Sequence, residues 1–109
     1  MQSEVQPADL EELRAALIEF LDFLQAHSRR SPHFQRYVQQ MLKSTDQCIR
    51  SGGHGMEAFN RHLLHDWQAA NHAQTGIPSW AIWVDDPQLC TLLNAQFQEK
   101  VMNLERFFS

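Results

Sequence analysis

The fold is decided by residues 51–83, which read SGGHG (51–55), MEAFNRHLLHDWQAANHAQ (56–74) and TGIPSWAIW (75–83). The first segment is a glycine break, and Gly52 stands where a left-handed residue ends the preceding helix. In the third segment, Gly76 followed by Ile77 and Pro78 is a strong stop signal, with the glycine expected at positive φ. A helix is therefore predicted over 56–75, with an aromatic connector after it.

Upstream of this stretch, leucines recur at three- and four-residue steps and predict a helix over 8–27. The acidic residues in its first turn would stabilise the helix, because negative charge interacts favourably with the positive end of the helix dipole. Further apolar residues widen the stripe to about half of the circumference, more than the roughly 100° of a one-sided surface helix. We therefore expect this helix to contact more than one neighbour. The stripe consists of Leu10, Leu13, Ala16, Leu17, Phe20, Leu21, Phe23 and Leu24.

A second helix is predicted from the Ser31-Pro32 pair to about Ser51. Serine is a favoured N-cap, and proline suits the first helical position because that position needs no N–H donor. Downstream of the break, Asp86-Pro87 repeats the same start signal for a helix that continues to about Phe107. Residues 79–84 could form either a short strand or one turn of helix. No other segment is a candidate for a second strand, and a lone strand would leave its backbone groups unpaired, so we expect a short helical or irregular crossover there.

Four amphipathic helices with short connections predict an all-α fold, an antiparallel four-helix bundle with a short Trp-containing crossover between the third and fourth helices. The 109 residues are expected to form a single domain, 1–109. Leu13, Met41, Leu63 and Leu93, one from each helix, should share one interior. The first and fourth helices carry more apolar residues than one seam requires, which predicts either a wide core or a homodimer interface.

Composition narrows the classes of function. Apolar residues make up 43% of the chain and charged residues 20%, which is typical of a globular protein. The sequence has no secretory signal pattern, and its apolar runs are too short for a membrane span. Cys48 and Cys90 form no C-x-x-C pair and fall on apolar stripes, which favours free thiols in a reducing compartment. A soluble, cytoplasmic protein is expected, without a membrane partner.

Histidines gather in the third helix, where His62 lies one turn from both His65 and Asp66. This spacing could bring two imidazoles, or an imidazole and a carboxylate, to one metal ion. A metal site needs three or four protein ligands that converge on the ion, and the sequence shows at most two here. The favoured alternative is a solvated helix face, and no cofactor is expected.

A basic ridge is predicted on the second helix, because Arg36, Lys43 and Arg50 recur every seven residues. It could contact phosphates or an acidic protein, or it could be ordinary solvated charge. The net charge of −4 argues against nucleic acid as the partner.

Trp80 and Trp83 in the connector are the strongest candidates for binding a partner, since tryptophan is enriched at interface hot spots. Three residues apart, they could share one side of a turn. An equally good interpretation is that they plug one end of the bundle.

The sequence carries neither a nucleophile elbow nor a glycine-rich phosphate loop. It therefore favours a non-enzymatic protein–protein interaction module, such as an accessory, regulatory or inhibitory protein. The alternative is a metal- or ligand-binding bundle that uses the histidines of the third helix.

Overall fold

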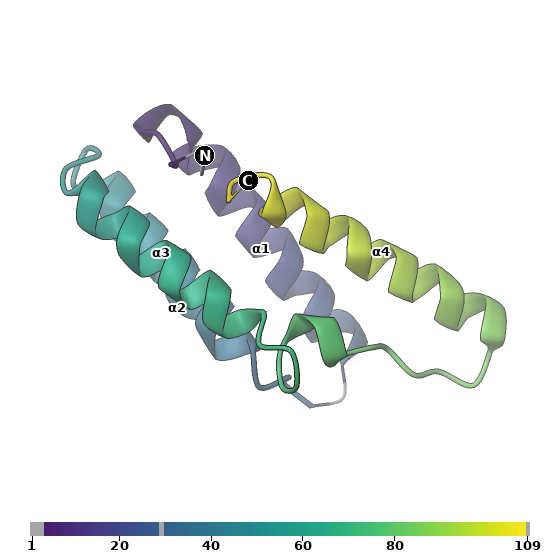
Figure 1. The fold of residues 1–109 in the computed structure, drawn as a ribbon. Helices are drawn as coiled ribbons and strands as arrows, with labels where there is room; N and C mark the ends of the chain where they lie inside the picture. The colour runs from purple at the N-terminus through teal and green to yellow at the C-terminus, as the bar shows by residue number, and fades with distance from the viewer. Residues whose placement is uncertain (1–3, 29, 109) are drawn as a thin grey trace.

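The computed structural model describes residues 4–28 and 30–108, and it confirms the all-α antiparallel four-helix bundle (Figure 1). A short 3-10 helix, η1 (Pro7–Asp9), precedes α1. A second one, η2 (Ile77–Ser79), lies in the connector between α3 and α4. The four main helices are α1 (Leu10–His27), α2 (Gln35–Arg50), α3 (Met56–Ala70) and α4 (Pro87–Glu105).

The first helix is the centre of the arrangement. α1 packs against α2 on one side and against α4 on the other, while α3 packs mainly on α2 (Figure 1). This position accounts for the wide apolar stripe of α1, because two neighbours must be covered. The prediction that α1 contacts more than one helix is therefore confirmed.

One buried cluster runs through the bundle, and it contains Leu13, Met41, Leu63 and Leu93, as predicted. Its densest part is aromatic. The ring of Phe97 from α4 lies 5.7 Å from Phe20 and 6.4 Å from Phe34, centroid to centroid. Phe34 is 1% exposed and therefore belongs fully to the core, although it precedes α2. Burying such rings supplies much of the apolar burial that stabilises the fold.

Two helix boundaries follow their sequence signals. Gly52 has φ 73°, the left-handed conformation expected after α2. Asp86 caps α4, since its Oδ1 accepts from the backbone N–H groups of Gln88 at 2.9 Å and Leu89 at 3.4 Å. Helix α4 ends at Glu105, two residues before the predicted Phe107.

The predicted start of the second helix is wrong. Ser31 makes no cap, and α2 begins at Gln35 after a turn in which the Gln35 N–H donates to the Pro32 carbonyl at 3.0 Å. This turn contains Phe34, whose ring is buried against Phe20 and Phe97. Burial of a large ring outweighs a cap, which contributes only about 1 kcal/mol.

The predicted end of the third helix is also wrong. Helix α3 stops at Ala70, five residues early, and the side chain of Asn71 donates to the Trp67 carbonyl at 2.9 Å. Gly76 has φ −105°, so it is not needed for a left-handed conformation. A Cβ there would lie 2.3 Å from the Ala70 carbonyl oxygen. Gly76 is required because the chain folds back closely against the end of α3.

Two asparagines tie extended segments to the helices. Asn60 of α3 accepts from the Val5 N–H at 2.9 Å and donates to the Val5 carbonyl at 3.0 Å. Asn94 of α4 holds Ile82 in the same way, at 2.8 and 3.0 Å. Each amide satisfies both backbone groups of one residue in a segment that lacks helical partners. The connector is therefore an irregular crossover, as expected, fixed to α4 at Ile82.

None of the helices in the described ranges is long and apolar enough to cross a membrane.

Candidate interaction surface

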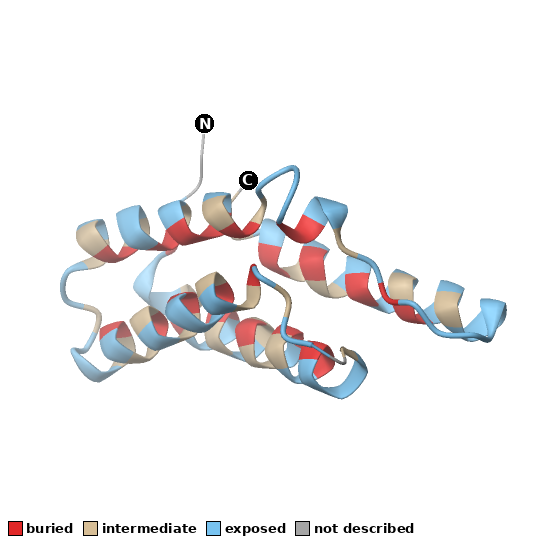
Figure 2. Cartoon of the chain, turned by 90° about the horizontal axis from the view of Figure 1, so that it is seen from below, coloured by how far each residue is buried: buried red, intermediate tan, exposed pale blue. Residues whose placement is uncertain are grey.

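Large apolar side chains are exposed in one part of the molecule. Among the described residues, all of the large hydrophobic side chains that are clearly exposed come from the connector or from α4. They are Trp83 at 85% exposure, Val84 at 37%, Leu89 at 43%, Leu92 at 53% and Met102 at 64%. Figure 2 shows the contrast, because buried residues line the sides of the helices that face one another, whereas the connector and the first turns of α4 are mostly exposed.

Helix α4 has apolar residues on two opposite sides. Leu93, Phe97, Val101 and Leu104 are buried against the rest of the bundle. On the opposite side lies a row at steps of four and three residues, which we call the outer α4 stripe: Gln88, Leu92, Ala95, Glu99 and Met102. All five residues of the stripe are exposed.

The exposed side of α4 is also poor in charge. Of the eleven exposed residues of α4, a fully described helix, only Glu99 and Glu105 carry a charge. On α1, four of the eight exposed residues are acidic, namely Glu11, Glu12, Glu19 and Asp22. Charge depletion together with exposed apolar side chains distinguishes interface cores from the remaining surface.

A shallow groove continues this surface onto α1. It has a volume of about 320 Å³, and its lining is mainly apolar. Ala26, His27 and Ser28 at the end of α1 form one side, and Val84, Leu89 and Leu93 form the other. The imidazole of His27 packs on Phe23 with centroids 4.7 Å apart.

The two connector tryptophans lie in different environments. The ring of Trp80 packs edge-on against Phe97, with centroids 4.8 Å apart, and against Phe34 at 5.8 Å. Trp83 is 85% exposed and lies outside the buried cluster. Trp80 thus packs at one end of the core, whereas Trp83 is left largely in solvent.

The basic ridge is exposed along its length, at Arg36, Lys43 and Arg50. Arg36 is held by its neighbour, because its Nη2 donates to the Tyr37 hydroxyl at 2.9 Å and its guanidinium lies 4.8 Å from the ring centroid. Asp46, on the same helix, pairs with Arg14 of α1 at 2.6 Å. The ridge therefore keeps its positive charge on the surface.

The histidines of α3 do not form one cluster. His65 Nδ1 lies 3.7 Å from Asp66 Oδ1, while His62 lines a pocket next to α2 that does not include His65 or Asp66. That pocket also contains His54 and Cys48, whose Sγ lies 3.4 Å from Met56 Sδ. Within residues 4–28 and 30–108, no three or more His, Cys, Asp or Glu side chains are grouped so that they could hold a metal ion.

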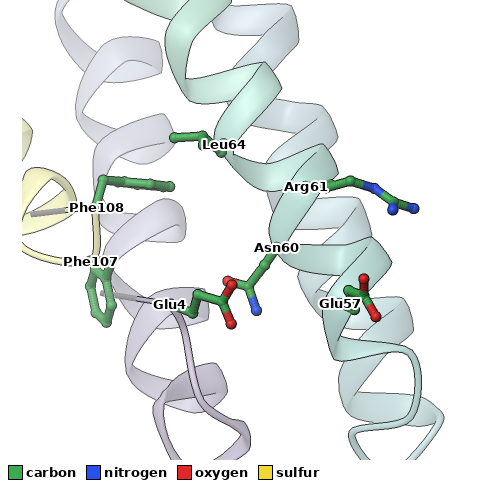
Figure 3. A pocket seen from close by; sticks show the side chains of 7 residues that line it. All are labelled: Glu4, Glu57, Asn60, Arg61, Leu64, Phe107 and Phe108. Carbon is green, nitrogen blue, oxygen red and sulfur yellow. The ribbon is translucent and has the colours of Figure 1, made fainter. Parts of the chain in front are cut away.

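A second cleft of about 220 Å³ opens between the N-terminal segment, α3 and the C-terminal aromatics (Figure 3). Phe107, Phe108 and Leu64 line it, with Glu4, Glu57, Asn60 and Arg61. Figure 3 shows the side chains of Glu57 and Arg61 extending away from the two phenylalanines. The amide of Asn60 is already bonded to Val5. The lining of the cleft is mixed, about as polar as it is apolar.

Sequence reasoning anticipated Trp83 and the surplus apolar residues of α4 but did not combine them into one surface. The spacing of Leu92, Ala95 and Met102 was a usable signal. Comparisons of the chain with protein-family models, with curated proteins and with solved structures give no match.

Proposed function

We propose that this protein is a non-enzymatic protein–protein interaction module, an accessory, regulatory or inhibitory protein that contacts its partner through the connector and the outward side of α4. The observation that carries this proposal is the concentration of the exposed large apolar side chains, among the described residues, in Trp83, Val84, Leu89, Leu92 and Met102. Large exposed apolar patches are costly in water unless a partner covers them.

Trp83 and Leu92 supply the contact energy in this proposal. A tryptophan ring that is 85% exposed contributes little to folding, but it would bury a large area on association. The groove between the end of α1 and Leu89 offers a place for an apolar side chain of the partner. Arg36, Lys43 and Arg50 stay a prediction for a second contact with an acidic protein.

Affinity capture from the native host with three bait proteins tests the proposal. The baits are the wild type, Leu92→Glu, and the control Ala15→Glu, which places the same charge on an exposed position of α1. We expect the wild type and Ala15→Glu to retain the same protein, either another copy of the chain or a different protein, and Leu92→Glu to lose it. Far-ultraviolet circular dichroism should show equal helicity for all three. Identical retention by Leu92→Glu would contradict the proposal.

A second candidate function is binding of a metal or small ligand by the histidines of α3. One observation supports it: His62 and His54 line a pocket of about 230 Å³ together with Cys48 and Ser51. Titration with zinc and with copper(I), followed by metal analysis of His62→Ala and His65→Ala, tests this candidate. This candidate function predicts binding that is lost in His62→Ala and kept in His65→Ala, because His65 lies outside this pocket. Absence of binding to the wild type would rule it out.

A further inference from the structure

We infer that the basic ridge of α2 docks an acidic helix of the partner protein, one that carries carboxylates at seven-residue intervals along one side. The ridge consists of Arg36, Lys43 and Arg50. This inference rests on the proposed function, in which the ridge makes a second contact, and it names the chemistry and the shape of the group that the ridge contacts.

The charge of the ridge is not neutralised by α2 itself. Helix α2 is described throughout, and all of its exposed charged residues are basic. Its one acidic residue, Asp46, is already paired with Arg14 of α1 at 2.6 Å. The other exposed residues of α2 are glutamines, which add hydrogen-bond donors but no charge: Gln39, Gln40 and Gln47. The outward side of α2 is therefore a positive and wholly polar surface.

The neighbouring helices leave this charge in place. Among the described residues, none from another helix forms an ion pair with the ridge. Arg36 is bonded to the neutral hydroxyl of Tyr37. The pocket between α2 and α3, and the pocket between the end of α1 and the first turns of α2, are both lined without an acidic residue. The ridge can therefore attract an anionic group from outside the chain.

The spacing of the ridge fits a helix. Seven residues are nearly two helical turns, so successive charges lie about 10.5 Å apart along α2. The row drifts by only about 20° per seven residues, so its charges form a nearly straight line. A second helix with carboxylates at the same interval can lie along α2 and place one carboxylate at each charge. In coiled coils, opposite charges repeated every seven residues select the partner helix in this way.

A nucleic acid fits this ridge less well than an acidic helix does. Phosphates follow one another about every 3.4 Å along each strand of a duplex, so charges at about three times that interval would leave most of the phosphates in the contact unpaired. The net charge of −4 also opposes the approach of a polyanion. A protein helix with few, widely spaced carboxylates avoids both costs.

The ridge sets the orientation and the rate of encounter more than the affinity. Exposed ion pairs are individually weak and are screened by salt. Complementary rows of charge nevertheless speed the encounter and fix the register of the two helices. A shift of the partner helix by half an interval would move every carboxylate away from its cation.

Two synthetic peptides of equal composition test the inference, at low ionic strength and with the purified full chain. Both are alanine- and glutamine-based helices of about 22 residues, with as many glutamates as the ridge has charges. In the row peptide the glutamates stand seven residues apart, and in the scattered peptide they are spread around the helix. Fluorescence anisotropy should give the row peptide a Kd about fivefold lower, and added salt should abolish the difference.

A matched pair of charge reversals locates the contact. Lys43→Glu should raise the Kd of the row peptide about fivefold, because it replaces the middle cation of the ridge with an anion. The control Lys100→Glu makes the same change of charge on α4 and should alter the Kd by less than about twofold. Circular dichroism should show equal helicity for both variants.

Each other outcome overturns a stated part of the inference. Equal binding of the two peptides overturns the match of spacing, and equal effects of Lys43→Glu and Lys100→Glu overturn the role of the ridge. If neither peptide binds, the inference as a whole fails. A single-stranded oligonucleotide that binds more tightly than the row peptide, and that Lys43→Glu releases, would identify a nucleic acid instead.

The same peptides separate this inference from the proposed surface on α4. Leu92→Glu should bind the row peptide as the wild type does, because Leu92 lies on α4 and the ridge on α2. Row-peptide binding together with host capture that Leu92→Glu retains would overturn the α4 surface and keep the ridge. Host capture that Leu92→Glu loses, without any binding of the row peptide, would keep the α4 surface and overturn the ridge.

Discussion

The rings of Trp67 and Phe108 stack face to face, with centroids 4.9 Å apart and planes 6° from parallel. Trp67 belongs to α3, and Phe108 follows the end of α4. Because α3 and α4 make few contacts of their own, this stack joins the two outer helices at one end of the bundle. Trp67 belongs to the buried core, and Phe108 packs against that core.

We predict that Phe108→Ala lowers the free energy of unfolding by about 1–2 kcal/mol, since it removes the stacking contact and part of the apolar burial. Urea denaturation followed by circular dichroism measures this change. Met102→Ala is the control, because Met102 is 64% exposed on α4 and should change stability by less than about 0.5 kcal/mol. Equal effects of the two substitutions would contradict the role of the stack.

The two connector tryptophans should differ in the same assay. Trp80→Ala removes a ring packed on Phe34 and Phe97, and should cost about 2–3 kcal/mol of unfolding free energy. Trp83→Ala removes a ring that is 85% exposed, and should change it by less than about 0.5 kcal/mol. If Trp83→Ala is the more destabilising substitution, the assignment of plug and contact residue is reversed.

The pairs Ser31-Pro32 and Asp86-Pro87 carry the same sequence signal for a helix start, so they provide a matched pair of variants. Asp86→Ala should destabilise the protein by about 1 kcal/mol, because it leaves the Gln88 and Leu89 N–H groups without their acceptor. Ser31→Ala should change stability by less than about 0.5 kcal/mol, since Ser31 caps no helix. Thermal unfolding of both variants checks the contrast. Equal losses would mean that α2 starts at Pro32 after all.

Burial raises the pKa of the Cys48 thiol above its ordinary value. The folded protein therefore holds this proton more tightly than the unfolded chain does, so the contribution of Cys48 to stability is complete below the unfolded pKa. That contribution is lost as the pH rises through the higher, folded pKa. We predict that stability falls more steeply at alkaline pH in the wild type than in Cys48→Ser, as measured by urea denaturation across alkaline pH.

Reactivity provides an independent measurement on the same thiol. Iodoacetamide should alkylate Cys48 more slowly than Cys90 in the native protein, because Cys48 is 5% exposed and thiolate is the reactive form. Mass spectrometry of Cys48→Ser and Cys90→Ser assigns the two rates. Faster reaction at Cys48 would show that the pocket it lines with His54 and His62 activates the thiol.

Helix periodicity was enough to predict the bundle, its four helices and a shared core that includes Leu13 and Met41. Periodicity is local, and the apolar stripes of all four helices are regular. The predicted helix boundaries were wrong where contacts between residues far apart in the sequence decide them. The start of α2 depends on Phe34 packing against Phe97, which lies 63 positions later in the chain.

The candidate surface was only partly predictable. Trp83 was named from its residue type, but its separation from Trp80 depends on Ile82, which is 3% exposed and is held by Asn94. An asparagine inside an apolar helix gives no sign of which backbone it will bind. The same holds for Asn60 and Val5, which lie 55 residues apart. Such contacts between distant segments carry no local signal.

The attachment of α4 mainly to α1 also bears on partial unfolding. Helices α1 and α2 each pack on the helix that follows in the chain, whereas α4 must return to α1 across the whole α2–α3 hairpin. The subglobal opening of lowest free energy should therefore release α4 first, so that its backbone amides exchange with deuterium sooner than those of α1 and α2. A partner that covers the outward side of α4 would slow this exchange without touching the rest of the bundle.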